Sequence, residues 1–200
     1  MRKFSYLTVV LTVVLLCACS GGGAIHEPAS PESGSLTISF NFDRQSGWAS
    51  NQFAVWIEDM NGNYINTLYA TRWTANGGFA TRPDSIHQWV EASGVAHMPQ
   101  SEVDSVSGAT PASGELSYAW DLTDKNGDMV ERGEYRFFVE GSLRWRNRVL
   151  YTGIVDLGGG EATVMGNLEF IFEASGSNAA LSNDASEMSM ITEVVAVWIP

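Results

Sequence analysis

Several short segments of this chain alternate between apolar and polar residues. In residues 36–42 (LTISFNF), apolar side chains at every second position alternate with polar ones. A period of two predicts a β-strand that buries one face and exposes the other. The same pattern, or a run of β-branched and aromatic residues, predicts further strands at residues 53–59, 63–73, 116–121, 134–140, 149–157, 162–173 and 190–200.

Turn residues separate these segments. The clearest turn is Asn61-Gly62, because Asn-Gly is favoured where two turn residues need positive φ angles. It predicts a hairpin that pairs residues 53–58 with residues 64–69. Roughly eight short strands separated by such turns predict an all-β fold, and an antiparallel β-sandwich in particular.

Residues 74–100 do not alternate in this way. Ser85 is a favoured N-cap residue, and the apolar residues after it recur at helical spacing. We therefore predict one short helix, at residues 85–92. The β-sandwich domain is expected to span residues 36–200 and to bury Trp120 in its core.

Composition and charge indicate a globular protein and argue against one class of partner. The chain has 200 residues, 44% of them hydrophobic and only 17% charged, which is typical of a protein that buries a core. Its formal net charge is −12, and Lys3 and Lys125 are its only lysines. Nucleic-acid binding depends on Lys and Arg that neutralise phosphates. This balance therefore argues against nucleic acid as a partner.

The start of the chain is an export signal. Two basic residues precede a ten-residue apolar run at residues 7–16, which is too short to span a bilayer and is typical of a signal peptide. The following Leu-Cys-Ala-Cys, ending at Cys19, resembles the bacterial lipobox, in which the last Cys is diacylated before cleavage. The resemblance implies a signal peptide at residues 1–18 and a glycine- and serine-rich tether at residues 19–35.

Lipidation of Cys19 would anchor the protein to the membrane through acyl chains. Ser20 follows the lipidated position, and this resemblance associates Ser there with sorting to the outer membrane. We therefore expect a lipid-anchored protein of the cell envelope that faces the periplasm. Cys17 would leave with the signal, so no second thiol would remain for a disulfide or a Cys-ligated metal.

One turn carries a family resemblance. The sequence WDLTDKNGDMVERGEY, at residues 120–135, resembles a turn of the immunoglobulin-like domain found in flagellar hook-capping proteins. In that domain the Trp packs inside, the Asp and Asn close the turn, and the Gly precedes a strand that opens with Tyr. The resemblance implies an immunoglobulin-like sandwich.

A wider pattern is similar to the family of predicted periplasmic proteins called domain of unknown function 2271. It combines VWIEDMNGNYINTLYATRW at residues 55–73 with Arg82-Pro83, Trp89, the Gly-Ala-Thr of residues 108–110 and the Trp-Asp turn. The resemblance covers residues 36–200. It implies a fold and a compartment rather than an activity.

The most specific chemical motif lies at residues 104–113 (DSVSGATPAS). It is similar to the flavinylation motif Asp-x-x-Ser/Thr-Gly-Ala-Thr of FMN-binding subunits in membrane redox complexes, where an exported flavin transferase joins FMN to the last Thr through its phosphate. The resemblance implies a phosphoester on Thr110 and a site composed of Asp104, Ser107, Gly108, Ala109 and Thr110.

Each position of this motif has a physical use. Thr110 offers the hydroxyl, and Pro111 disfavours the helical region at the residue before it, which keeps the acceptor extended. Gly108 and Ala109 have almost no side chain, so a transferase and a flavin ring can approach the backbone. Asp104 would orient the loop, or a metal in the transferase. The alternative is that SGATPASG merely connects two strands.

The other candidate sites in the sequence are less specific than this motif. The stretch at residues 124–128 (DKNGD) is more typical of a turn than of a calcium loop, and the three histidines share no metal-ligand spacing. No Gly-x-Ser-x-Gly elbow supports a hydrolase. Arg144, Arg146 and Arg148 alternate, which favours a solvated edge strand and leaves open an anionic partner such as a flavin phosphate.

Two functions of different classes follow. The first is a redox carrier rather than a catalyst, with covalent FMN on Thr110 and with a flavin transferase and envelope redox proteins as partners. The second is a binding or structural module of the envelope that has no cofactor. No metal is expected in either case.

Overall fold

The computed structural model describes residues 34–46, 50–143, 148–171 and 189–200. The predicted signal peptide, the lipidated Cys19 and nearly all of the predicted tether lie outside these residues. The first strand begins at Ser35, one residue before the predicted start of the domain.

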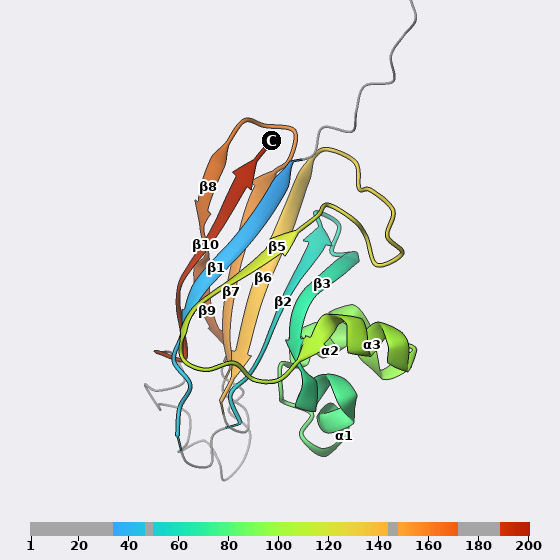
Figure 1. The fold of residues 1–200 in the computed structure, drawn as a ribbon, viewed down its shortest axis with the longest axis vertical. Helices are drawn as coiled ribbons and strands as arrows, with labels where there is room; N and C mark the ends of the chain where they lie inside the picture. The colour runs from blue at the N-terminus through green and yellow to red at the C-terminus, as the bar shows by residue number, and fades with distance from the viewer. Residues whose placement is uncertain (1–33, 47–49, 144–147, 172–188) are drawn as a thin grey trace, which may run out of the picture. The chain divides into compact units, whose positions relative to one another are not determined.

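Two β-sheets form the body of the described chain (Figure 1). The smaller sheet has four strands in the order β5-β1-β10-β8, and all its pairs are antiparallel. Its central strand β1 pairs with β5 on one side and with β10 on the other. The strands are β1 (Ser35–Phe42), β5 (Gly114–Trp120), β8 (Ala162–Met165) and β10 (Ile191–Ile199).

The larger sheet has six strands in the order β4-β3-β2-β6-β7-β9. The first pair, between β3 and β4, is parallel, and the others are antiparallel. The predicted sandwich-like β architecture is thus confirmed, with one parallel pair that the sequence did not predict. The strands are β2 (Gln52–Asp59), β3 (Tyr64–Thr71), β4 (Ser107–Gly108), β6 (Glu134–Ser142), β7 (Arg148–Asp156) and β9 (Asn167–Ile171).

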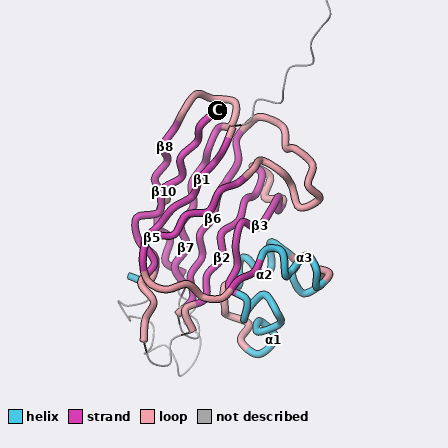
Figure 2. Tube along the Cα trace, viewed as in Figure 1, coloured by secondary structure: helices cyan, strands magenta, loops and turns pink. Residues whose placement is uncertain are grey.

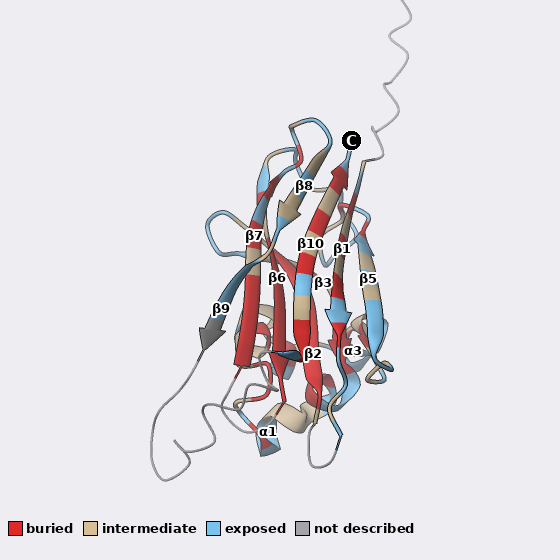
Figure 3. Cartoon of the chain, turned by 90° about the vertical axis from the view of Figure 1, so that its left-hand side faces the viewer, coloured by how far each residue is buried: buried red, intermediate tan, exposed pale blue. Residues whose placement is uncertain are grey.

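The main core fills the space between the sheets. Trp120 is buried, as expected, and its ring packs edge-on against Tyr135 with 5.4 Å between centroids. Trp198 is buried as well. β2 and much of β6 and β7 are buried along their length, as Figure 3 shows in red. These central strands are covered on both faces, so they have apolar residues at consecutive positions.

The predicted hairpin is present. β2 pairs with β3 through a turn in which Gly62 has a φ of 82°. The Asp59 carboxylate accepts hydrogen bonds from the backbone amides of Asn61 and Asn63, both at 2.8 Å, and these bonds hold the turn. The pairing register shifts twice along the hairpin, once between Val55 and Trp56 and once between Ile57 and Glu58.

The segment between β3 and β4 holds more helix than the single short helix predicted. Ser85 does not cap α2, because its hydroxyl is hydrogen-bonded to that of Thr74 at 2.8 Å, and Ile86 precedes the helix in the left-handed region. Figure 2 shows these helices gathered beside β3. They are η1 (Thr74–Gly78), α1 (Phe79–Thr81), α2 (His87–Ser93), η2 (Val95–His97) and α3 (Gln100–Val106).

This helical layer covers the outer face of the larger sheet. Trp89 of α2 and Val103 of α3 belong to a second apolar cluster that also contains Trp56, Phe138 and Leu150 from the strands. The Trp89 indole N–H donates to the Thr67 hydroxyl of β3 at 2.8 Å. The sequence pattern missed this layer because its apolar residues are spread over several short turns.

A buried ion pair anchors the layer to the sheet. Glu140 of β6 accepts hydrogen bonds from the backbone amides of Gln88 and Trp89, at 3.3 and 3.0 Å. The guanidinium of Arg148 lies 3.7 Å from the same carboxylate, and both side chains are buried. The predicted solvated edge strand is therefore wrong for Arg148, because β7 lies between β6 and β9. Arg144 and Arg146 fall outside the described residues.

The predicted strand at residues 162–173 is two strands, since β8 ends at Met165 and β9 begins at Asn167 in the other sheet. The chain passes from one sheet to the other at Gly166, which lies between the two strands. A Cβ on it would lie 3.0 Å from the Val194 side chain, so a larger residue here would force Val194 to shift.

Candidate functional site

Thr110 lies in the connection that leads from one sheet to the other. β4 is the edge strand of the larger sheet, and residues 109–113 run from it to β5 of the smaller sheet. Ala109 is exposed and Thr110 is half-buried. The Thr110 hydroxyl forms no hydrogen bond with any residue that the structure describes. This hydroxyl is therefore not committed to holding the loop in place.

Gly108 is required by its neighbour Tyr69. A Cβ on Gly108 would lie 2.6 Å from the Tyr69 hydroxyl oxygen and 2.8 Å from its ring. That hydroxyl donates a hydrogen bond to the Ala109 carbonyl at 2.6 Å. The space beside Gly108, which we expected to admit a transferase, is thus filled by Tyr69. Access to the backbone comes instead at Ala109 and Thr110.

Aromatic rings support the loop from inside the sandwich. Tyr69 stacks on Tyr118 with 4.9 Å between centroids and on Phe53 with 5.3 Å, and Tyr118 stacks on Phe40 with 6.0 Å. Burial raises the pKa of Tyr69 and of Tyr118, so both phenols are neutral across the physiological range. The wall behind the loop is therefore rigid and uncharged.

The other motif residues lie in regular elements. Asp104 lies on α3, and its exposed carboxylate accepts a hydrogen bond from Gln100 of the same helix at 2.9 Å. Ser107 is buried in β4, and its hydroxyl has no hydrogen-bond partner among the described residues. The Ser113 hydroxyl accepts the Arg44 backbone amide at 2.9 Å, which ties the loop to the end of β1.

Two exposed arginines accompany the loop. Arg44 is joined to it through the backbone bond to Ser113, and Arg72 directly follows Thr71, which pairs with Gly108. Neither residue was singled out from the sequence. Arg44 follows the predicted strand at residues 36–42 in a chain that has few cations, which is a signal that could have found it. Arg72 falls inside the predicted strand at residues 63–73, whereas β3 ends at Thr71.

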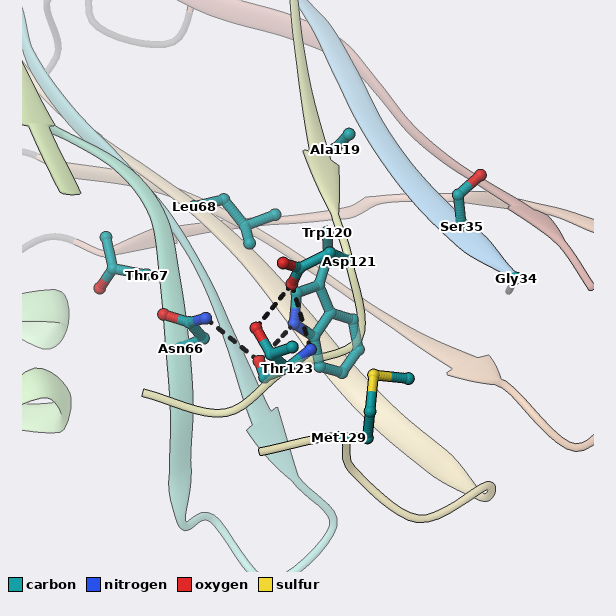
Figure 4. Close-up of a pocket in the computed structure, with 10 residues that line it drawn as sticks. All are labelled: Gly34, Ser35, Asn66, Thr67, Leu68, Ala119, Trp120, Asp121, Thr123 and Met129. Carbon is teal, nitrogen blue, oxygen red and sulfur yellow. Dashed lines mark hydrogen bonds between the residues drawn. The ribbon is translucent and has the colours of Figure 1, made fainter. Parts of the chain in front are cut away.

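A pocket of about 630 Å³ lies at the other end of β5 (Figure 4). It opens between β3 and β5, and its polar side chains are used internally. The Thr123 carbonyl accepts the Trp120 indole N–H at 2.8 Å and the Asn66 amide at 3.1 Å, and the Asp121 carboxylate accepts the Thr123 hydroxyl at 2.7 Å. Leu68, Ala119 and the exposed Met129 supply apolar lining.

The stretch at residues 124–128 forms the predicted turn. The Asp124 carboxylate accepts hydrogen bonds from the backbone amides of Asn126 and Asp128, at 2.8 and 3.0 Å, and Gly127 has a φ of 85°. The hydrogen bond from the Asp128 backbone amide does most to lower the pKa of Asp124. Within the described ranges, no three or more His, Cys, Asp or Glu side chains cluster to hold a metal ion.

The model of a family described as predicted periplasmic protein (DUF2271) matches residues 35–170. The chain belongs to the DUF2271 family. Two other comparisons find nothing: no curated protein matches this DUF2271 chain, and no solved structure does. Among the residues described, no helix of this DUF2271 protein is long and apolar enough to span a membrane.

The loop of this DUF2271 protein is chemically suited to a phosphate-linked group. It offers a hydroxyl that makes no hydrogen bond to the part of the chain that the structure describes, on a segment held by the Tyr69 bond to Ala109 and by the bond of Ser113 to Arg44. Arginine side chains suit a phosphate, because guanidinium groups bind phosphate oxygens in pairs. Arg44 donates its backbone amide to Ser113, and Arg72 follows the residue that pairs with Gly108. A hydroxyl and exposed guanidinium groups are the kinds of group that a phosphoester at Thr110 would use.

Proposed function

We propose that this protein is an exported redox carrier that holds FMN covalently on Thr110, on an immunoglobulin-like sandwich anchored to the membrane through Cys19. The observation that carries the proposal is the Thr110 hydroxyl, which has no hydrogen bond within the described chain and lies in a connection outside the strand ladder. The motif at residues 104–110 and the family description of a predicted periplasmic protein support it.

The attachment step is a phosphoryl transfer. The Thr110 hydroxyl attacks the flavin-side phosphorus of a flavin dinucleotide held by the transferase, and a new Oγ–P bond forms. The anhydride P–O bond breaks, and a nucleoside monophosphate leaves with the bridging oxygen. The hydroxyl proton passes to a base of the transferase. No oxidant or reductant is consumed in this step.

Bound FMN would supply electron transfer, and the chain would supply attachment and surroundings. Covalent attachment prevents loss of the flavin outside the cytoplasm, where no pool replaces it. The Tyr69 hydroxyl would hold the loop beside the attachment point, through its bond to the Ala109 carbonyl. Envelope redox proteins would then donate and accept electrons at the exposed side of the loop.

Coexpression with a flavin transferase in an exporting host tests the proposal. Wild-type protein is expected to gain the mass of one FMN moiety less water, carried by a peptide that contains Thr110. Thr110→Ala should lose the label completely, and Thr110→Ser should retain it because the hydroxyl remains. Ser113→Ala is the matched control, since its hydroxyl holds the loop and does not accept the flavin.

Thermal denaturation of the same samples separates lost labelling from lost folding. Thr110→Ala should change the stability by no more than about 0.5 kcal/mol, because its side chain makes no hydrogen bond to the described residues. An unlabelled wild type, under conditions that label a known acceptor, would contradict the proposal.

A second candidate is an envelope binding module without a cofactor. The observation that favours it is the pocket between β3 and β5, which has apolar lining at Leu68 and Met129. Fold alone does not decide between the two functions. The coexpression experiment distinguishes the two functions, because a binding module without a cofactor would gain no FMN.

A further inference from the structure

Two strands leave the larger sheet at the same end and in register. β3 and β4 are parallel, with Ala70 opposite Ser107 and Thr71 opposite Gly108. The next two residues after β3 are Arg72 and Trp73, and the second residue after β4 is Thr110. Figure 1 shows the helical segment and the connection to β5 departing from this common end. The fold thus brings an arginine and a tryptophan to the neighbourhood of the acceptor.

Trp73 is unusual among the tryptophans that the structure describes. It is 46% exposed, whereas the other four are at most 1% exposed. A Cβ on Gly78 would lie 2.7 Å from the Trp73 ring, so the indole rests directly against this glycine. An indole supported on one side and open to solvent elsewhere is a surface on which another flat ring can stack.

Arg72 brings positive charge to the same place. Its side chain is exposed, and its charge opposes the rise that burial causes in the pKa of Tyr69. The Tyr69 hydroxyl is the group that holds the Ala109 carbonyl, one residue before Thr110. The charge of Arg72 is therefore felt at the Tyr69 hydroxyl, the group that holds the residue next to Thr110.

We propose that Trp73 and Arg72 form the binding subsite for the flavin carried by Thr110. The indole stacks on the isoalloxazine ring, and the guanidinium pairs with the phosphoester. The inference rests on the proposed function, because it concerns how the attached group is held. A tether at Thr110 gives the flavin a high effective concentration at this subsite, so modest contacts are sufficient to keep it docked.

Flavin fluorescence tests the stacking directly, because an electron-rich indole in contact with oxidised flavin quenches its emission. Labelled wild type, Trp73→Leu and Trp73→Phe are compared at equal flavin absorbance, with intact mass confirming one FMN per chain. Trp73→Leu should raise the emission about fivefold, the ratio of stacked to unstacked states for a typical aromatic pair. Trp73→Phe should fall between the two.

Salt tests the charge contact. Emission of labelled wild type should rise as salt screens the ion pair. Arg72→Gln should remove this salt dependence, whereas the matched control Lys125→Gln should leave it unchanged, since Lys125 lies in the turn at residues 124–128. Thermal denaturation confirms that each variant is folded.

The outcomes separate this subsite from the proposed function. Labelled Trp73→Leu with the emission of wild type would overturn the subsite while leaving Thr110 as the acceptor. An unlabelled wild type would overturn both. If folded Trp73→Leu takes no label, Trp73→Phe and Arg72→Gln decide in its place. Loss of the label in those variants too would assign the residues to transferase recognition and would refute the subsite.

Discussion

The buried carboxylate of Glu140 makes the stability of the helical layer depend on pH. Glu140 lies on β6, is fully buried, and accepts hydrogen bonds from two backbone amides at the start of α2. Burial raises its pKa from 4.5 to about 7, although these two amides and Arg148 oppose the shift. One pKa unit corresponds to about 1.4 kcal/mol. The shift therefore corresponds to a difference on the order of 3 kcal/mol between acidic and neutral pH.

The sign follows from proton linkage. Between the unfolded pKa of 4.5 and the folded pKa of about 7, the native state binds more protons at Glu140 than the unfolded state does. The free energy of unfolding should therefore fall as pH rises across this window. Urea denaturation at several pH values measures it. Glu140→Gln should lose this component, and Glu134→Gln, an exposed change on the same strand, should keep it.

Removing the charge of Glu140 alone leaves Arg148 buried without its carboxylate, which costs about 3–5 kcal/mol in comparable cases. If the single variant does not fold, the double variant Glu140→Gln, Arg148→Met removes both charges and serves in its place. The reasoning is refuted if wild type and the folded variant show the same pH dependence between about pH 4.5 and 7.

Three further predictions concern the core, the loop and the anchor. Trp120→Ala should lower the free energy of unfolding by roughly 3–5 kcal/mol in urea denaturation, because it removes a large buried ring. Gly108→Val should displace Tyr69, cost about 1–3 kcal/mol and reduce labelling of Thr110, whereas Ala109→Val should leave the stability within about 0.5 kcal/mol. Cys19→Ala should move the protein from the membrane fraction to the soluble periplasm or leave it unprocessed, and a wild type that is already soluble would contradict the anchor.

The parts of the fold that follow local rules could be predicted from the sequence. Alternation located β1, and Asn61-Gly62 located the β2–β3 hairpin, because both depend on neighbouring residues alone. The break at Gly166 could not be predicted in this way. Apolar residues continue on both sides of it, and the change of sheet depends on Val194 from a distant strand.

The candidate site was predicted as a string of residues and not as an arrangement. The sequence singled out Thr110 and Asp104 but did not predict the helix that carries Asp104, because α3 has only seven residues and little periodicity to detect. It also missed Tyr69 and Trp73. Their relation to Thr110 depends on the parallel pairing of β3 with β4, which joins segments about 40 residues apart, as the Tyr69 bond to Ala109 shows.

In the motif at residues 104–113, Gly108 and Ser113 have structural roles in the fold, whereas the hydroxyl of Thr110 has none among the described residues. Gly108 is needed because Tyr69 occupies the place of its side chain, and Ser113 is needed because it ties the loop to β1. Packing alone therefore explains why small residues stand at these positions, and they say little about a cofactor. Thr110 differs, because no contact with the described residues requires its hydroxyl. Its chemistry is free to serve a partner outside the fold, which is the reason to search for the flavin there.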